Sequence, residues 1–252
     1  MHPSDPFVAG HAPRRTIRTL VLALLLAVSL ALPAAASGAS KPYTLDLGRR
    51  NDFVGQTNLV QCVGASMQMM INMIRPKNDR TAKTQLKLQK LARHWSGRRP
   101  DGSTRSGASV WGWSAGLNIM DAGPYKVVGH DTLAEALRAA ATAMRKTRRP
   151  VGLLVWRGRH AWVMSGFRAT ADPLKSTSFR VTAVFVEDPL YPNRRSTWGP
   201  TPTPGEALST TELGRQFVPR RPRSRWMSSF RNQYVMVLPY ILDTQRYAGL
   251  YL

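Results

Sequence analysis

Cysteine is nearly absent from this sequence of 252 residues, which contains a single one, Cys62. One cysteine excludes an internal disulfide and any zinc site built from paired cysteines. The chain also lacks an internal repeat, a glycine-rich phosphate loop and an RNA-binding signature, so a nucleic-acid partner is not indicated. No cluster of metal-ligating side chains is present in the sequence, and we expect neither a metal nor a cofactor.

Acidic residues are also scarce, because 14 Asp and Glu stand against 36 Lys and Arg, a net charge of +22. Such a surplus predicts attraction to polyanions. For a protein outside a cell these are an anionic cell-surface polymer, a membrane surface or an acidic substrate. The basic residues are scattered and lie mostly at the ends of expected elements, so a solvated surface is the alternative.

The N-terminus carries the pattern of a secretory signal peptide. Three arginines precede an apolar run from Leu20 to Leu32, and an Ala-x-Ala sequence follows at 34–36. The run is short for a membrane span, with an uncleaved membrane anchor as the alternative. We therefore expect a secreted protein, with residues 1–36 as the signal peptide and 37–252 as one domain. Removal of the signal peptide leaves 33 basic and 13 acidic residues. An unpaired thiol in an oxidising compartment is typical of burial, intermolecular pairing or reactivity.

Apolar periodicity predicts a chain that begins with helices and continues with strands. The expected helices are 62–74, 81–95, 109–120, 133–148 and 209–217, and the expected strands are 125–128, 151–156, 160–167, 179–186 and 234–239. Segment 37–55 is expected to be an extended lead-in, and segment 192–208 is expected to be irregular. The order favours an α+β domain with an antiparallel sheet. Trp111 and Trp113 begin the third helix, where they line either a cleft or the core.

Cys62 opens an apolar helical segment whose stripe recurs at i, i+4, i+7, i+8 and i+11. A thiol in the first helical turn lies beside unpaired backbone N–H groups and the positive end of the helix dipole, and both favour the nucleophilic thiolate. Six residues upstream, Gln56 offers an amide donor to the same place. The alternative is a small buried hydrophobe with no chemical role.

A nucleophilic thiol needs a base, and the base needs an orienting group. His94 is expected in a solvated basic helix, and His130 at a helix entrance. His160 instead begins a strand of the apolar sheet, and Asp188 ends the next long strand. Adjacent antiparallel strands bring the start of one beside the end of the next, which predicts contact between His160 and Asp188. Glu187 is the rival orienter if the register differs by one residue.

These residues together resemble a known family. The order Gln56-x5-Cys62, Cys62-Val-Gly-Ala, His160-Ala and Asp188-Pro189 resembles the papain-like cysteine peptidases, and most closely the C39-like peptidase domains, over residues 52–240. The resemblance implies a papain-like fold with N-terminal helices packed on a C-terminal antiparallel sheet. It also implies that Gln56 lines the oxyanion hole, Cys62 is the nucleophile, His160 the general base and acid, and Asp188 the orienter. The sequence departs from the family at Gln61, where many relatives have an acidic residue.

Two other functions fit the same residues. Cell-wall amidases and transglutaminase-type acyl transferases share the order of cysteine before histidine. A catalytically silent papain-like protein that binds anionic polymers through its basic surface is the third hypothesis. The peptidase hypothesis expects a peptide or protein substrate and a Cys62–His160–Asp188 triad.

Overall fold

The computed structural model describes residues 41–97, 102–103, 106–222 and 229–242. All of them belong to one compact unit, Ser40–Leu252. The predicted signal peptide, 1–36, lies outside the described residues. Within the described ranges, none of the helices has both the length and the apolar character needed to cross a membrane.

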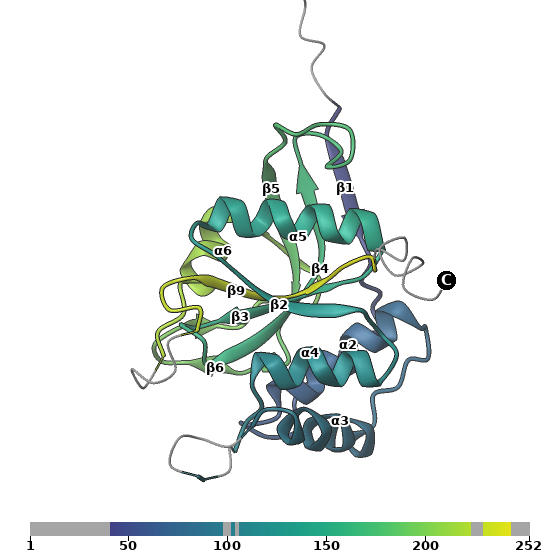
Figure 1. Ribbon diagram of the computed structural model, residues 1–252, viewed down its shortest axis with the longest axis vertical. Helices are drawn as coiled ribbons and strands as arrows, with labels where there is room; N and C mark the ends of the chain where they lie inside the picture. Colours follow the sequence, from purple (N-terminus) through teal and green to yellow (C-terminus); the bar gives the residue numbers. More distant parts are fainter. Residues whose placement is uncertain (1–40, 98–101, 104–105, 223–228, 243–252) are drawn as a thin grey trace, which may run out of the picture. The chain divides into compact units, whose positions relative to one another are not determined.

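A seven-stranded antiparallel sheet forms the centre of this unit (Figure 1). Its strand order is β2-β9-β3-β4-β5-β8, and β1 pairs with the second half of β4. The strands are β1 (Tyr43–Asp46), β2 (Tyr125–His130), β3 (Val151–Val155), β4 (His160–Ala169), β5 (Val181–Glu187), β8 (Glu206–Ser209) and β9 (Tyr234–Pro239). A separate two-stranded ribbon consists of β6 (Arg194–Arg195) and β7 (Gly199–Pro200).

Helices cover both faces of the sheet. The described residues include α2 (Cys62–Ile74), α3 (Ala82–His94), α4 (Val110–Ile119), α5 (Leu133–Thr147) and α6 (Thr210–Gln216). Helices α2 and α4 pack on one face, and α3 packs on these two helices rather than on the sheet. Helix α5 crosses the opposite face, with α6 near one end of it (Figure 1). The fold is therefore mixed α+β with an antiparallel sheet, as the sequence predicts.

Local sequence explains why α5 and α6 begin where they do. Thr132 and Ser209 each accept a hydrogen bond from the backbone of the third helical residue, whose Glu side chain bonds back to the cap. These two capping boxes satisfy N–H groups that the helix itself leaves without a partner. The capping-box signatures Thr132-x-x-Glu135 and Ser209-x-x-Glu212 can be read directly from the sequence. The buried face of α5 includes Ala136, Leu137 and Met144.

The extended segment 37–55 contains a strand, and the expectation that 192–208 is irregular is wrong at its C-terminal end. Residues 43–46 form β1, and residues 206–209 form the edge strand β8, which pairs with β5. Both strands are four residues long, and most of their side chains are exposed or half-buried. They are held by backbone hydrogen bonds to longer neighbours, so they need no alternating apolar pattern of their own. Of the two tryptophans in α4, Trp113 is fully buried core and Trp111 is 39% exposed.

Candidate active site

The sulfur of Cys62 lies at the first residue of α2. Cys62 is only partly buried, whereas most of the helix behind it is buried on all sides. No acidic residue occupies the first turn, and among the hydrogen bonds of the described residues the Cys62 N–H has no acceptor. The Ser66 hydroxyl donates to Ala161 O at 3.4 Å, which joins the first turns of α2 to the start of β4. Cys62 is therefore a free thiol at the positive end of a helix dipole.

His160 begins β4, and Asp188 directly follows β5, the strand that pairs with β4. The long hairpin between them returns the chain, so that residues 28 apart in sequence meet at the same end of the sheet. The His160 Nε2 and Asp188 Oδ1 atoms are 2.7 Å apart. Leu190 N–H also donates to Asp188 Oδ1, at 2.8 Å, which fixes the carboxylate. Asp188 is fully buried and His160 is 5% exposed.

The Cys62 sulfur is the second group, after Asp188, that acts on the His160 ring and raises its pKa. Because Nε2 faces Asp188, Nδ1 is the nitrogen left for the sulfur. Burial is the largest single influence on His160 and disfavours its charged form, but the hydrogen bonds and charges of Asp188 and Cys62 outweigh burial and raise the pKa of His160 to about 9. The imidazole is therefore largely protonated at neutral pH, between an acceptor carboxylate and a thiol.

Glu187, the rival orienter, has no hydrogen bond or ion pair with His160 among the described residues. Its side chain is buried, and its Oε2 has no hydrogen-bond partner among the described residues. Burial is the main cause that raises the pKa of Glu187 to about 8, and the nearby carboxylates of Asp46 and Asp52 raise it further. The structure therefore places Asp188, and not Glu187, against the histidine.

Gln56 lies upstream of Cys62 in residues 48–61, which we call the strap. Its backbone N–H donates to Pro189 O at 2.7 Å, which ties the strap to the residue after Asp188. Its side-chain Nε2 donates to Asn58 O at 2.8 Å, and no hydrogen bond among the described residues joins Gln56 to Cys62. An amide nitrogen carries two hydrogens, so one donor of Gln56 remains for another acceptor.

Two buried glutamines of α3 hold the strap and the start of α2. Gln85 accepts from Thr57 N–H at 2.8 Å and donates to Gly55 O at 2.9 Å. Gln89 accepts from Gly64 N–H, in the first turn of α2, and donates to Val60 O, each at 2.9 Å. The sequence predicted α3 as a surface helix, which holds only for its outer side. The spacing of the two glutamines, one turn apart beside Leu88 and Ala92, is the signal for an inward polar face.

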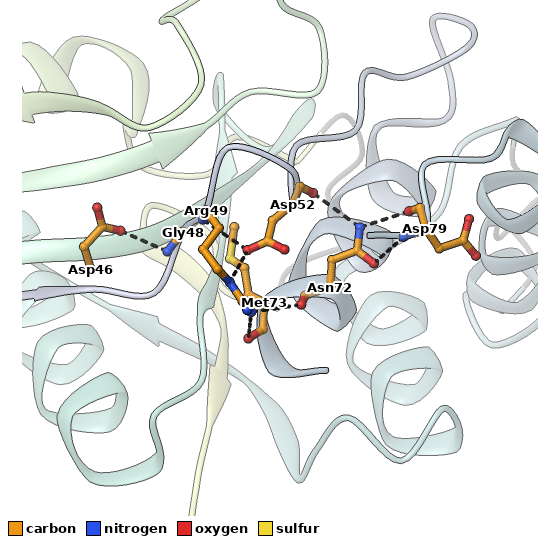
Figure 2. A network of polar contacts seen from close by, with 7 residues as sticks. All are labelled: Asp46, Gly48, Arg49, Asp52, Asn72, Met73 and Asp79. Carbon is orange, nitrogen blue, oxygen red and sulfur yellow. Dashed lines mark hydrogen bonds and ion pairs between the residues drawn. The ribbon is translucent and has the colours of Figure 1, made fainter. Parts of the chain in front are cut away.

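The other end of the strap is fastened to the C-terminal end of α2 (Figure 2). Arg49 pairs with Asp52 at 3.3 Å and donates to the carbonyls of Asn72 and Met73. A guanidinium group at the C-terminus of a helix satisfies carbonyls that lack partners within the helix and interacts favourably with the dipole. The Asn72 side chain links the strap backbone at Asp52 to Asp79 beyond the helix. The strap therefore spans α2 from its last turn to its first.

An indole ring covers the histidine. The rings of Trp156 and His160 are stacked, with centroids 4.3 Å apart and planes at 23°. Trp156 Nε1 donates to Gln216 Oε1 at 2.7 Å, and Trp198 also stacks with Trp156, with ring centroids 6.0 Å apart. This arrangement shields the hydrogen bond between His160 and Asp188 from water, which strengthens it. Sequence reasoning missed Trp156, which it assigned only to the end of a buried strand.

The other two histidines in the described part of the chain, His94 and His130, lie outside this cluster. His94 is exposed at the end of α3, and His130 ends β2. In the parts of the chain that the structure describes, no group of three or more His, Cys, Asp or Glu side chains is placed to hold a metal ion. The arrangement around Cys62 is that of a nucleophile, a base and an orienter, which suits attack on an electrophilic carbonyl carbon.

No protein-family model, no curated protein and no solved structure matches the chain.

Proposed function

We propose that the protein is an exported cysteine peptidase that hydrolyses peptide or amide bonds through Cys62, His160 and Asp188. One observation carries the proposal: the imidazole of His160 is hydrogen-bonded to a buried carboxylate at 2.7 Å, and its pKa is raised by that carboxylate and by the only thiol of the chain. A cysteine with a purely structural role is normally inert and has no oriented histidine beside it. A histidine held by a buried carboxylate next to a thiol is instead the arrangement that activates a nucleophile.

The proposed reaction starts from an ion pair in which His160 already holds the proton given up by Cys62, so that the sulfur is a thiolate and the ring an imidazolium. The thiolate attacks the substrate carbonyl carbon, and the carbonyl electrons move to oxygen. His160 then returns the proton to the leaving amine as the C–N bond breaks, which leaves a thioester on Cys62. Water, deprotonated by His160, hydrolyses the thioester and restores the ion pair. Asp188 keeps Nδ1 of the ring directed at the sulfur throughout.

The oxyanion that forms in this reaction needs donors near Cys62. The Cys62 N–H is the first candidate, since it lies at the helix N-terminus without an acceptor. The second N–H of the Gln56 amide is the other candidate, once substrate enters. Each such donor contributes on the order of 3 kcal/mol to the transition state. Stacking of Trp156 and fastening of the strap support the proposal, because both restrict motion of the reacting groups.

We also propose that the domain has a papain-like arrangement of the C39-like kind. The order of the four residues along the chain supports this, as does a nucleophile helix packed against an antiparallel sheet that begins with the histidine. The presence of α5 on the far face of the sheet is an addition to the helices-then-sheet arrangement inferred from the sequence.

Covalent labelling of Cys62 tests the proposed reactivity. At neutral pH we expect iodoacetamide and an epoxide inhibitor of the E-64 type to label the protein with a stoichiometry of one, and Cys62→Ala to remove all label. His160→Gln is expected to slow labelling on the order of 100-fold, because the base is lost. The matched control is His94→Gln, an exposed histidine whose loss leaves the rate unchanged. Equal rates in His160→Gln and the wild-type protein would contradict the proposal.

Substrate assays then separate the peptidase from its alternatives. Hydrolysis of casein or peptides, without clearing of a cell-wall zymogram, is the expected result. Clearing of the zymogram alone would assign a wall amidase, and amine incorporation into glutamine substrates would assign a transglutaminase-type transferase. A thiol that reacts no faster than free cysteine would leave the polymer-binding hypothesis.

A further inference from the structure

The solvent side of α3 carries a row of positive charge. Lys83, Lys87, Lys90 and His94 are exposed and follow one another at intervals of four, three and four residues, which places them on one stripe of the helix. The inward stripe is the one that holds Gln85 and Gln89. None of the ion pairs among the described residues involves these lysines.

The charge of this stripe is not balanced by neighbours in sequence. Between residues 76 and 97 the only acidic residue is Asp79. Its carboxylate accepts hydrogen bonds from Gln68, Thr81 and Thr84, so it is occupied at the base of the helix. These hydrogen bonds lower the pKa of Asp79, and that of Thr84 is the largest cause. The lysines therefore meet solvent as a net positive surface.

Exposed apolar side chains gather around the same helix. Nine large hydrophobic residues are exposed in the described part of the chain, and four of them lie on α3, at its end or in the adjacent strap. They are Leu86 (43% exposed), Trp95 (52%), Leu59 (67%) and Val60 (40%). The hydrogen bond from Gln89 to Val60 O keeps the strap beside α3. Exposed apolar side chains beside a row of basic ones are a combination found at surfaces that contact a membrane.

We propose that this surface, which consists of the α3 lysine stripe with Leu86, Trp95, Leu59 and Val60, docks the protein on an anionic phospholipid membrane. Lysine ammonium groups match the negative headgroups of such a membrane. Tryptophan and leucine insert at the boundary between headgroups and acyl chains, as in helices that lie in the plane of an interface. A soluble anionic polymer offers the lysines the same charge but gives the four apolar side chains nothing to enter, so the lipid surface is favoured.

The membrane proposal does not depend on the proposed peptidase activity, although the docking surface and the proposed active site lie next to each other in the strap. Leu59 and Val60 precede Cys62 by three and two residues, so docking through the strap brings the thiol close to the headgroups. Substrates attached to a membrane are the class that this placement serves. Binding is measured in the Cys62→Ala protein, so that loss of activity and loss of docking are separate results.

Vesicle flotation with the full chain tests the proposal. The probes are vesicles of phosphatidylcholine alone and vesicles in which about one third of the lipid is phosphatidylglycerol. We expect binding to the anionic vesicles only. The triple variant Lys83→Gln/Lys87→Gln/Lys90→Gln is expected to bind on the order of 100-fold more weakly, since each lysine near the surface contributes about fivefold. The matched control, Lys41→Gln/Lys146→Gln/Lys175→Gln, removes the same charge from exposed lysines elsewhere and is expected to change binding about twofold or less.

The pair Leu86→Ser/Trp95→Ser distinguishes lipid from polymer. We expect it to weaken vesicle binding about tenfold while binding to a soluble polyphosphate chain is unchanged. Unchanged vesicle binding in this pair would assign the stripe to a soluble polyanion and overturn the membrane proposal. Equal weakening by the two lysine triples would show that only net charge matters and would overturn it as well. Circular dichroism of each variant confirms that these exposed substitutions leave the fold intact.

Discussion

The two helical layers of the molecule differ in what they bury. On one face of the sheet, the buried residues of α5 are all apolar: Ala136, Leu137, Ala140, Ala141 and Met144. On the other face, α2 and α3 bury Ser66, Gln68, Asn72, Gln85 and Gln89 among their apolar side chains. Both layers are continuous cores with the sheet, so the difference is not one of size.

The difference shows how the fold divides stability from geometry. Apolar burial is strong but has no preferred direction, and it tolerates small shifts between elements. Hydrogen bonds have strict distances and angles, and each buried polar group without a partner costs about 1–3 kcal/mol. The polar groups of α2 and α3 lie on the side that carries Cys62 and the strap. That layer therefore fixes positions, whereas the α5 layer mainly contributes stability.

Truncation of one fully buried methionine in each layer is expected to give the largest change in stability among the tests of this comparison. We expect Met144→Ala in α5 to lower the free energy of unfolding by about 2–5 kcal/mol, through lost burial and a residual cavity. The rate of Cys62 alkylation in the folded protein should stay unchanged. The matched variant, Met70→Ala in α2, should lose similar stability and also slow alkylation several-fold, because it loosens the helix that bears the thiol.

Urea denaturation and alkylation kinetics measure both effects. If Met144→Ala slows alkylation as much as Met70→Ala does, the two layers are not distinct in function, and the division proposed above fails.

Loss of one inward glutamine tests the polar layer directly. Gln89→Leu leaves Gly64 N–H and Val60 O without partners, and we expect a loss of about 1–3 kcal/mol in unfolding free energy for this change. Alkylation of Cys62 should slow about tenfold, because the first turn of α2 and the strap are no longer joined. Gln89→Glu keeps the acceptor for Gly64 N–H but has no donor for Val60 O when ionised, so it should recover only part of the rate. Equal rates in Gln89→Leu and the wild-type protein would reduce Gln89 to a structural residue.

The sequence predicts the elements whose signals are local. The capping box of Thr132 and Glu135, the start of a helix at Cys62 and the apolar strand that begins at His160 each depend on a few neighbouring residues. Contact between His160 and Asp188 follows from the pairing of two adjacent strands, so it could also be predicted from the sequence.

Other features depend on segments that are far apart in the sequence. Gln85 contacts Thr57, 28 residues away, and Trp156 contacts Gln216, 60 residues away. A glutamine in a lysine-rich helix gives no local sign that a strap will cover it. The edge strands β1 and β8 are missed for the same reason, since their partners rather than their own side chains hold them.

The buried carboxyl group of Glu187, at the end of β5, gives the smallest expected change in stability. The pKa of Glu187 is raised to about 8 in the folded protein, above its ordinary value, so folding favours the protonated form. Stability from this group is complete below the unfolded pKa and is lost as pH rises through about 8. Between pH 7 and 9 we expect the wild-type protein to lose about 1.4 kcal/mol more than Glu187→Gln, which cannot ionise. Groups other than Glu187 contribute equally to both proteins, so their effects cancel in the comparison. Parallel losses in urea denaturation at the two pH values would mean that Glu187 is solvated, and that the polar layer is less tightly closed than the hydrogen bonds of α2 and α3 imply.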